Sequence, residues 1–300
     1  MKPRLLVTGA AGQLGRDLVG HLTGRPGIEV VPADRPGTEL PDVGGAGGLH
    51  FDLTDRGATI GAVELVGPRW IVHGAAWAEV DACEGDPDRA FGVNSYGTRN
   101  VAEAARRAGA HVCYISTDYV FDGTLQRPYT EWDTTNPVSV YGRSKLGGEQ
   151  ELDPGWTVAR TSWLFGAHGS NMVKTVLRMG ARPPEAGPLR FVDDQRGCPT
   201  GSEDLAARVA DLALSCTPGV FHVTNQGPTT WYGLARDVLA AAGLDPGRVV
   251  PITTAELDPL PAAARPANSV LDNRAMASAG MDLLADWHAP MERLVRGMIG

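Results

Sequence analysis

The sequence predicts a doubly wound α/β fold, in which helices cover both faces of a parallel sheet and a smaller mixed α/β lobe is attached. Short apolar runs alternate with amphipathic segments over the first half of the chain, a pattern typical of strands that are buried on both faces. A glycine-rich turn joins the first of these runs to a helix. After about Ser162 the alternation loosens, and there we expect the smaller lobe to begin.

The first half of the chain supplies the expected sheet. Residues 5–7 form the first strand, and the helix after it carries Leu14, Leu18 and Leu22 on one face. Asp86-Pro87 begins a helix that ends near Gly109, because proline is favoured in a first turn. Another helix follows Pro137. The further strands expected here are 28–31, 49–51, 70–73, 111–115 and 156–159.

The second half reads as a mixture of helices and short strands. The expected helices are 170–179, 202–214, 231–242 and 286–298, and the expected strands are 189–192, 220–223 and 249–252. In doubly wound sheets, ligands bind at the carboxyl ends of the strands. The residues that follow each strand are therefore the first candidates for a functional site.

Composition excludes several classes of protein. The 300 residues are 43% hydrophobic and 21% charged, which is enough apolar material for a large core. The net charge of −8 is spread along the chain without a basic block, so a nucleic-acid partner is not expected. No apolar stretch is long enough to span a membrane, and no cleavage site follows the N-terminus. The four cysteines (83, 113, 198, 216) are widely separated, which favours a reducing cytoplasm over a disulfide framework.

The turn Gly9-Ala10-Ala11-Gly12-Gln13-Leu14-Gly15 predicts a dinucleotide site. Missing side chains let backbone amides approach a pyrophosphate at the positive end of a helix. Asp34 ends the second strand, where a carboxylate usually binds the adenosine ribose, whereas the neighbouring Arg35 suits a 2′-phosphate. These two residues do not separate NADPH from NADH, so both stay open here, with NADPH taken as the expected cofactor. Further candidate cofactor contacts follow the third and fourth strands: Asp52, Leu53, Ala75 and Ala76.

Tyr141 and Lys145 predict acid catalysis. They lie four residues apart in an expected helix and share a face, so the ammonium can lower the pKa of the phenol and hold a cofactor ribose. Only three of the 27 basic residues are lysines, which makes this YxxxK pair informative. Ser116 and Thr117 follow a strand, where a hydroxyl can polarise a substrate carbonyl. A solvated helix pair and a turn-forming Ser/Thr are the alternatives without function.

Several segments resemble a known family. GAAGQLG, VNSYGTRNVAEAA with Asn94, STDYVFDG and YGRSKLGGE are similar to the extended short-chain dehydrogenases/reductases. RTSWLFGAHGSNMVKTVLR, DDQRGCPTGSEDLA and RPANSVLDN resemble, more narrowly, the dTDP-4-dehydrorhamnose reductase branch. The resemblance covers almost the whole chain.

This resemblance implies an NAD(P)H-dependent oxidoreductase that reduces the C4 ketone of a dTDP-4-keto-6-deoxyhexose, for example dTDP-4-dehydro-L-rhamnose to dTDP-L-rhamnose. Thr117, Tyr141 and Lys145 match the family's catalytic set, and Asn94 matches a residue that supports proton transfer and cofactor binding. The implied cofactor contacts add Ser116 to the residues of the glycine turn. The implied substrate contacts are Thr117, Asp118, Tyr119, Val120, Trp163, Asn171, Arg265 and Asn268.

The same resemblance suggests a domain division. Residues 1–165 and 189–225 are expected to form the dinucleotide-binding domain, and 166–188 and 226–300 the substrate-binding lobe. Family members include a magnesium-dependent homodimer whose acidic ligands match Asp17 and Glu203. Position 17 is one methylene shorter than in that pattern, so we expect no metal, while a homodimer stays a candidate assembly.

Three alternative functions use the same scaffold. Dehydratases carry an acid directly after the Thr-Asp pair, where this chain has Tyr119, so dehydration is disfavoured. A non-catalytic NADP-binding regulatory subunit and a nucleotide-sugar 4-epimerase both stay open. Retention of the hydroxyl, phenol and ammonium favours catalysis over binding alone.

Overall fold

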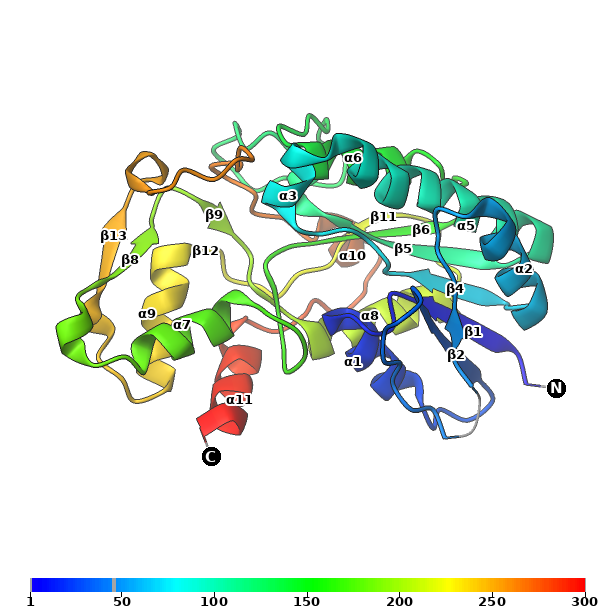
Figure 1. Ribbon diagram of the computed structural model, residues 1–300, viewed down its shortest axis with the longest axis horizontal. Coiled ribbons are helices and arrows are strands. Elements are labelled where there is room, and N and C mark those ends of the chain that lie inside the picture. The colour runs from blue at the N-terminus through cyan, green and yellow to red at the C-terminus, as the bar shows by residue number, and fades with distance from the viewer. Residues whose placement is uncertain (1, 45–46, 300) are drawn as a thin grey trace.

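A seven-stranded parallel sheet is the centre of the computed structural model, which describes residues 2–44 and 47–299. The strand order is β11-β6-β5-β4-β1-β2-β3 (Figure 1). Its strands are β1 (Arg4–Thr8), β2 (Glu29–Asp34), β3 (Leu49–His50), β4 (Trp70–His73), β5 (His111–Thr117), β6 (Thr157–Thr161) and β11 (Gly219–His222). The chain runs outward from β1 to β3 and then returns to β4 beside β1. The predicted doubly wound α/β fold is confirmed.

Helices cover both faces of this sheet (Figure 1). On one face, α1 (Gln13–Leu22) packs against α8 (Ser202–Leu214), and Leu18 and Val209 are buried together in that core. On the other face, α2 (Arg56–Val66) packs with α5 (Gly97–Ala108), where Val63 and Val101 are buried. The sheet is thus shielded from water on both sides, which explains its almost continuously apolar strands.

Two helices of this half differ from the sequence-based expectation. The helix expected from Asp86 to Gly109 is divided into α4 (Pro87–Phe91), a π-helical turn (Gly92–Tyr96) and α5. The π-turn inserts an extra residue into the helical ladder, a feature frequent at functional sites. Neither α2 nor α3 (Val80–Gly85) was expected, because α2 carries two glycines and α3 is short.

A smaller lobe lies beside the carboxyl ends of the sheet strands (Figure 1). It contains α7 (Met172–Gly180), α9 (Trp231–Ala241) and α11 (His288–Ile299), which pack around a separate apolar core. Three two-stranded sheets belong to the lobe and its border: β7 (Leu164–Phe165) with β10 (Thr200–Gly201), β8 (Leu189–Val192) with β13 (Val249–Ile252), and β9 (Arg196–Gly197) with β12 (Thr229–Thr230).

Strand β8 belongs with the smaller lobe in its contacts, although the sequence-based division assigned its residues to the larger domain. It pairs with β13, and Leu189 and Phe191 pack into the lobe's core. The helices α6 (Val140–Glu149) and α10 (Arg274–Ser278) complete the fold. Within residues 2–44 and 47–299, none of the helices has the length and apolar character needed to cross a membrane.

Candidate active site

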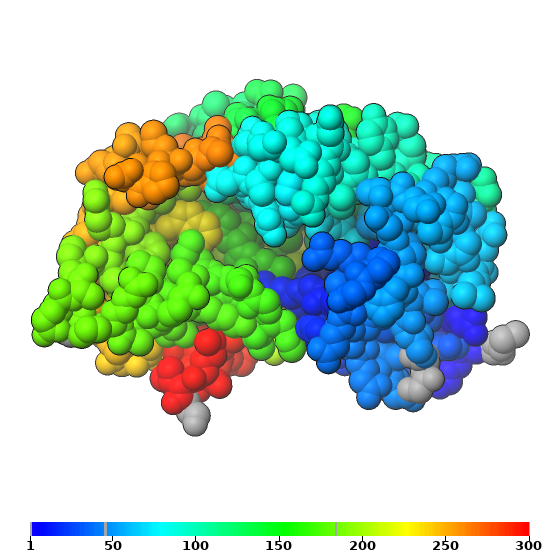
Figure 2. Space-filling model, in the orientation of Figure 1, coloured from blue at the N-terminus to red at the C-terminus, as the bar shows by residue number. Residues whose placement is uncertain are grey.

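A cavity of about 340 Å³ opens at the carboxyl ends of the neighbouring strands β1 and β4, at the point where the strand order reverses. The space-filling view shows the molecular surface hollowed between the smaller lobe and the N-terminal part of the chain (Figure 2). The cavity is lined by the glycine turn after β1, by the ends of β5 and β6, and by α6. Doubly wound proteins bind their ligands at this topological position.

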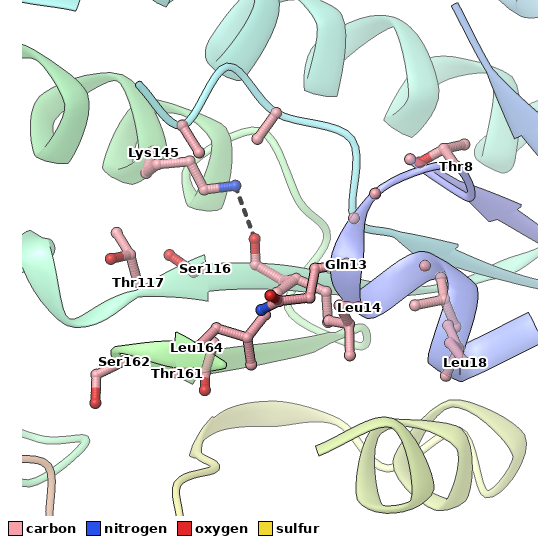
Figure 3. A pocket seen from close by; sticks show the side chains of 18 of the residues that line it. Thr8, Gln13, Leu14, Leu18, Ser116, Thr117, Lys145, Thr161, Ser162 and Leu164 are labelled. Carbon is pink, nitrogen blue, oxygen red and sulfur yellow. Dashed lines mark hydrogen bonds between the residues drawn. The ribbon is translucent and has the colours of Figure 1, made fainter. Parts of the chain in front are cut away.

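The glycine turn needs its glycines for steric reasons. Gly9 has φ +73°, and a Cβ atom there would lie 2.6 Å from the backbone nitrogen of Ala75. A side chain at Gly15 would collide with the carbonyl of Gly9. Gly12 precedes α1, and no side chain caps that helix. The turn therefore brings bare backbone to the cavity, together with Gln13 and Leu14, the first two residues of α1 (Figure 3).

Asp34 stands at the end of β2, next to this turn. Its Oδ2 accepts a hydrogen bond from the backbone N–H of Ala11 at 2.9 Å, and its Oδ1 accepts one from the N–H of Arg35 at 2.8 Å. The side chain of Arg35 is exposed. Asp52 caps a turn through the N–H of Thr54, and Leu53 is half-buried behind it.

Thr117, Tyr141 and Lys145 all line the cavity. Lys145 points from α6 toward β5, and its Nζ donates to the carbonyl of Ile115 at 2.7 Å (Figure 3). Burial lowers the pKa of Lys145 to about 7, and the negative charge of Glu149 acts against that shift. Burial also raises the pKa of Tyr141 above its usual value, while the Thr117 hydroxyl acts in the opposite direction. The three groups form a constellation that can protonate and polarise a carbonyl.

A buried ion pair lies behind this constellation, and no sequence motif predicts it. Glu149, one helical turn after Lys145, forms a bidentate pair with Arg160 of β6 at 2.6 and 2.9 Å. Ser116 also donates to Glu149, at 2.5 Å. Ser116, an expected cofactor contact, therefore also joins β5 to α6 through this hydrogen bond.

Asn94 lies in the π-turn and is fully buried. Its Oδ1 accepts from the N–H of Trp77 at 2.8 Å, and its Nδ2 donates to the Trp77 carbonyl and to Ser144 on α6. Asn94 therefore joins α6 to the segment after β4, where Ala76 lines the cavity and Ala75 packs on the glycine turn. The π-turn is what places this amide between the two segments.

The expected substrate contacts occupy two regions. Asp118 and Trp163 line the cavity, and Trp163 has the unusual φ of 46° and stacks on Trp231 at 3.5 Å. Tyr119 packs edge-on against Tyr141, with ring centroids 5.8 Å apart. Val120 is instead fully buried in an apolar cluster.

The other three expected substrate contacts have protein partners. Arg265 pairs bidentately with Asp81 at 2.7 Å. Asn268 is buried and donates to the carbonyls of Leu125 and Arg127. Asn171 begins α7 and donates to Gln13 of the glycine turn at 2.8 Å, so it links the smaller lobe to that turn.

Comparison with known proteins shows which family the chain belongs to. The model of the family described as the RmlD substrate binding domain matches residues 2–299. The chain belongs to this family, in the dTDP-4-dehydrorhamnose reductase branch of the extended short-chain dehydrogenases/reductases. The predicted resemblance is confirmed.

Curated relatives match along nearly the whole chain. A dTDP-4-dehydrorhamnose reductase of Streptomyces griseus is 40% identical, covering 100% of this chain and 95% of the relative. A dTDP-4-keto-6-deoxy-D-glucose reductase of Streptomyces niveus is 37% identical, covering 96% of this chain and 94% of the relative. Among solved structures, the dTDP-4-dehydrorhamnose reductase of Bacillus anthracis in complex with NADP has a TM-score of 0.88 and 33% identity, covering 99% of this chain and 100% of that one.

The two acidic positions considered for a metal in this reductase branch, Asp17 and Glu203, differ in their surroundings. Asp17 on α1 accepts a hydrogen bond from Ser202 and lies 3.6 Å from His168 Nε2. Glu203, at the start of α8, is exposed. Within residues 2–44 and 47–299, no group of three or more metal-ligating side chains is clustered.

Some cavity-lining residues of this family member were missed by the sequence-based reasoning. Ala78, Thr161, Ser162 and Leu164 all line the cavity. Thr161 ends β6 and Ser162 follows it, so the strand-end rule that selected Thr117 could also have selected them. Ala78 and Leu164 have no chemistry of their own that a motif could reveal.

Proposed function

We propose that the protein is an NADPH-dependent reductase of the C4 ketone of a dTDP-4-keto-6-deoxyhexose, active in nucleotide-sugar biosynthesis. The observation that carries this proposal is that Thr117, Tyr141 and Lys145 line the same cavity as the glycine turn. The relatives named as reductases of such sugars support the substrate class. NADP in the Bacillus anthracis reductase supports the cofactor.

The residues fit a dinucleotide. Cβ atoms at Gly9 and Gly15 would collide with neighbouring protein backbone, so the shape of the turn depends on their absence. We assign the pyrophosphate to Gly9, Gly12, Gln13 and Leu14, the adenosine end to Asp34, Arg35, Asp52 and Leu53, and the nicotinamide end to Ala75, Ala76, Ser116, Tyr141 and Lys145. When bound, the reduced nicotinamide supplies the hydride for the carbonyl carbon.

The chain's own residues handle the proton. Tyr141 donates its phenolic proton to the ketone oxygen as negative charge develops there. Lys145, as a cation, lowers the cost of the resulting phenolate and holds the ribose of the cofactor. Thr117 donates a hydrogen bond to the same oxygen. Asn94 supports the reaction by holding the segment after β4 against α6.

Substrate contacts are assigned by position. Asp118, Tyr119 and Trp163 surround the reacting sugar, with Val120 supporting their turn from the core. Asn171, Arg265 and Asn268 are assigned to the nucleotide diphosphate, Arg265 exchanging its pair with Asp81 for phosphate oxygens. The division into a dinucleotide-binding domain and a substrate-binding lobe is proposed with β8 in the lobe.

The setting is proposed from composition. All four cysteines are free, three of them buried, which is consistent with a reducing cytoplasm. We propose a homodimer as the candidate assembly, with no bound metal and no nucleic-acid partner. Size-exclusion chromatography with light scattering, with and without Mg²⁺, tests the first two expectations.

The decisive experiment supplies purified dTDP-4-keto-6-deoxy sugars, with and without a 3,5-epimerase, and follows the consumption of NADPH and NADH. The reductase consumes NADPH in proportion to the reduced sugar formed. Epimerisation without net consumption, with the cofactor retained through purification, would indicate the 4-epimerase. NADPH binding without turnover of any such sugar would indicate the regulatory subunit.

Tyr141→Phe tests the proton donor. The variant keeps the aromatic ring and loses the proton, so turnover should fall by about 10³-fold while the affinity for NADPH changes by less than about twofold. Steady-state kinetics and titration of NADPH against tryptophan fluorescence measure the two quantities. Turnover equal to that of the wild type would reject Tyr141 as the donor.

A further inference from the structure

Asp118 follows Thr117 in the chain, and one of its two carboxylate oxygens has no partner. Oδ1 accepts a hydrogen bond from the Thr117 hydroxyl at 3.0 Å, whereas Oδ2 is buried without any hydrogen bond. The residue is 2% exposed and lines the cavity. Leaving a charged oxygen buried and unpaired is costly, so this environment favours the neutral carboxyl.

Thr117 has a single hydrogen to donate. In the structure that hydrogen goes to Asp118, while the Thr117 oxygen accepts from the backbone N–H of Tyr119 at 3.2 Å. A hydroxyl is one donor and a double acceptor. Thr117 therefore cannot donate to Asp118 and to a ketone oxygen at the same time. While Asp118 is ionised, Thr117 offers only a lone pair to the cavity.

Protonation of Asp118 reverses this hydrogen bond. A neutral carboxyl donates from Oδ1 to the Thr117 oxygen, and the Thr117 hydrogen is then free to turn toward the cavity. We propose, on the basis of the proposed function, that Asp118 is a positioning residue whose neutral carboxyl orients the Thr117 hydroxyl toward the C4 ketone oxygen. The proton on Asp118 is held and is not transferred to the sugar, because Tyr141 supplies the proton that balances the hydride.

The surroundings of Asp118 agree with a neutral carboxyl near physiological pH. Burial raises the pKa of Asp118 to about 7, with the hydroxyls of Ser269 and Thr117 acting against that shift. The titratable side chains around it are Tyr119 of its own turn, Tyr141 of α6 and Cys198 after β9. Burial raises the pKa of each of these three, so they are neutral too.

The charged side chains in this region act on the neighbours of Asp118 and not on its carboxyl directly. Arg265 acts on Tyr119, but its guanidinium is engaged by Asp81. Arg196 acts on Cys198. The groups that act on the Asp118 carboxyl itself are uncharged, namely the hydroxyls of Ser269 and Thr117 and the backbone N–H groups of its own turn. Its protonation state is thus set mainly by burial.

Asp118→Asn tests the proposal, because an amide N–H can donate to Thr117 at every pH. In the wild type, kcat/KM for the keto sugar should fall as the pH rises through about 7, with Asp118 and Lys145 both losing protons. Over about two pH units above 7, the slope of log kcat/KM against pH should approach −2 in the wild type and −1 in Asp118→Asn. Asp118→Leu, of similar shape without a donor, should lose about 100-fold below pH 7, where the wild-type carboxyl is neutral, and the deficit should shrink at higher pH.

Several results would overturn the proposal. One is a wild-type slope of about −1, which needs no variant at all. A second is an Asp118→Asn variant whose slope equals that of the wild type. A third is an Asp118→Asn variant that is as slow as Asp118→Leu, although both variants bind NADPH normally. If the wild-type chain reduces no dTDP-4-keto sugar at any pH, the proposed function itself fails. Wild-type turnover with unaltered profiles in the variants would reject only the role of Asp118.

Discussion

The Nζ atom of Lys145 lies 2.7 Å from the carbonyl oxygen of Ile115, at the end of strand β5. The same nitrogen lies 4.1 Å from the centroid of the Tyr114 ring. Lys145 is 2% exposed, and its surroundings stabilise the ammonium less well than water does. The fold therefore keeps a cation inside the protein at a cost in stability, at the one place where the proposed reaction needs it.

The cost of burying Lys145 should appear in the pH dependence of stability. The folded pKa of about 7 lies below the ordinary value of 10.5, so the unfolded chain binds more protons between these two values. The penalty is complete below about pH 7 and is relieved as the pH rises toward 10.5. Relative to Lys145→Met, the wild type should therefore gain stability between about pH 6.5 and about pH 9.5.

Urea unfolding of both proteins at the two pH values measures this difference. A free-energy difference that is independent of pH would contradict the lowered pKa. The Met variant should also lose about 100-fold or more in turnover, since it cannot stabilise a phenolate at Tyr141.

Breaking the pair of Glu149 with Arg160 should lower the free energy of unfolding by more than breaking an exposed ion pair does. Their side chains are 7% and 6% exposed, so Glu149→Gln leaves the guanidinium buried without its counter-charge. We expect a loss of about 3–5 kcal/mol in the free energy of unfolding, and a smaller loss when Arg160→Met is added. Urea titration without cofactor measures both.

Glu151→Gln is the matched control, because Glu151 pairs with Arg99, whose side chain is 55% exposed. That substitution should cost no more than about 1 kcal/mol. Equal losses for Glu149→Gln and Glu151→Gln would show that burial of the first pair adds nothing. Removing the charge of Glu149 should also lower the pKa of Lys145 further and move the alkaline fall in activity to lower pH.

The fold of the larger domain could be predicted because each of its main strands is an apolar run between turn signals. The lobe was predicted less well. Strands β7, β9, β10 and β12 are two residues long, and no periodicity can be read from two residues. Helix α2 was missed because its two glycines lower helix propensity, and packing against α5 overrides that preference.

The candidate site divides in the same way. Tyr141 and Lys145 could be paired from their spacing, since a helix places i and i+4 on one face. Glu149 and Arg160, or Trp163 and Trp231, meet only after the chain has folded. Their contacts depend on how β6 is aligned with α6 and α9, which single-sequence patterns do not specify.

Trp231 should control the affinity for the sugar nucleotide through Trp163. The two indoles stack in parallel at 3.5 Å, and Gly197 leaves the space that the Trp163 ring occupies. Trp231→Ala removes this support, so the KM for the keto sugar should rise by up to about tenfold, with a smaller change in kcat. The KM for NADPH should stay within about twofold.

Trp132→Ala is the control for Trp231, because the side chain of Trp132 is 69% exposed. It should leave both KM values unchanged. If Trp231→Ala changes kcat alone, or affects both substrates equally, the stacked pair does not act on the sugar site.

Arg35 should decide the preference for NADPH over NADH. The carboxylate of Asp34 is already engaged by the backbone N–H groups of Ala11 and Arg35, which fixes the end of β2 beside the glycine turn. The exposed guanidinium of Arg35 follows directly and can meet a 2′-phosphate.

A hydrogen bond to a charged group contributes about 1.5–3 kcal/mol. Arg35→Ala should therefore raise the KM for NADPH by about tenfold or more and leave that for NADH within about twofold. Initial rates with each cofactor at a fixed concentration of keto sugar measure this ratio, with Arg190→Ala, an exposed arginine on β8, as the control. An unchanged ratio in Arg35→Ala would mean that the 2′-phosphate is recognised elsewhere on the chain.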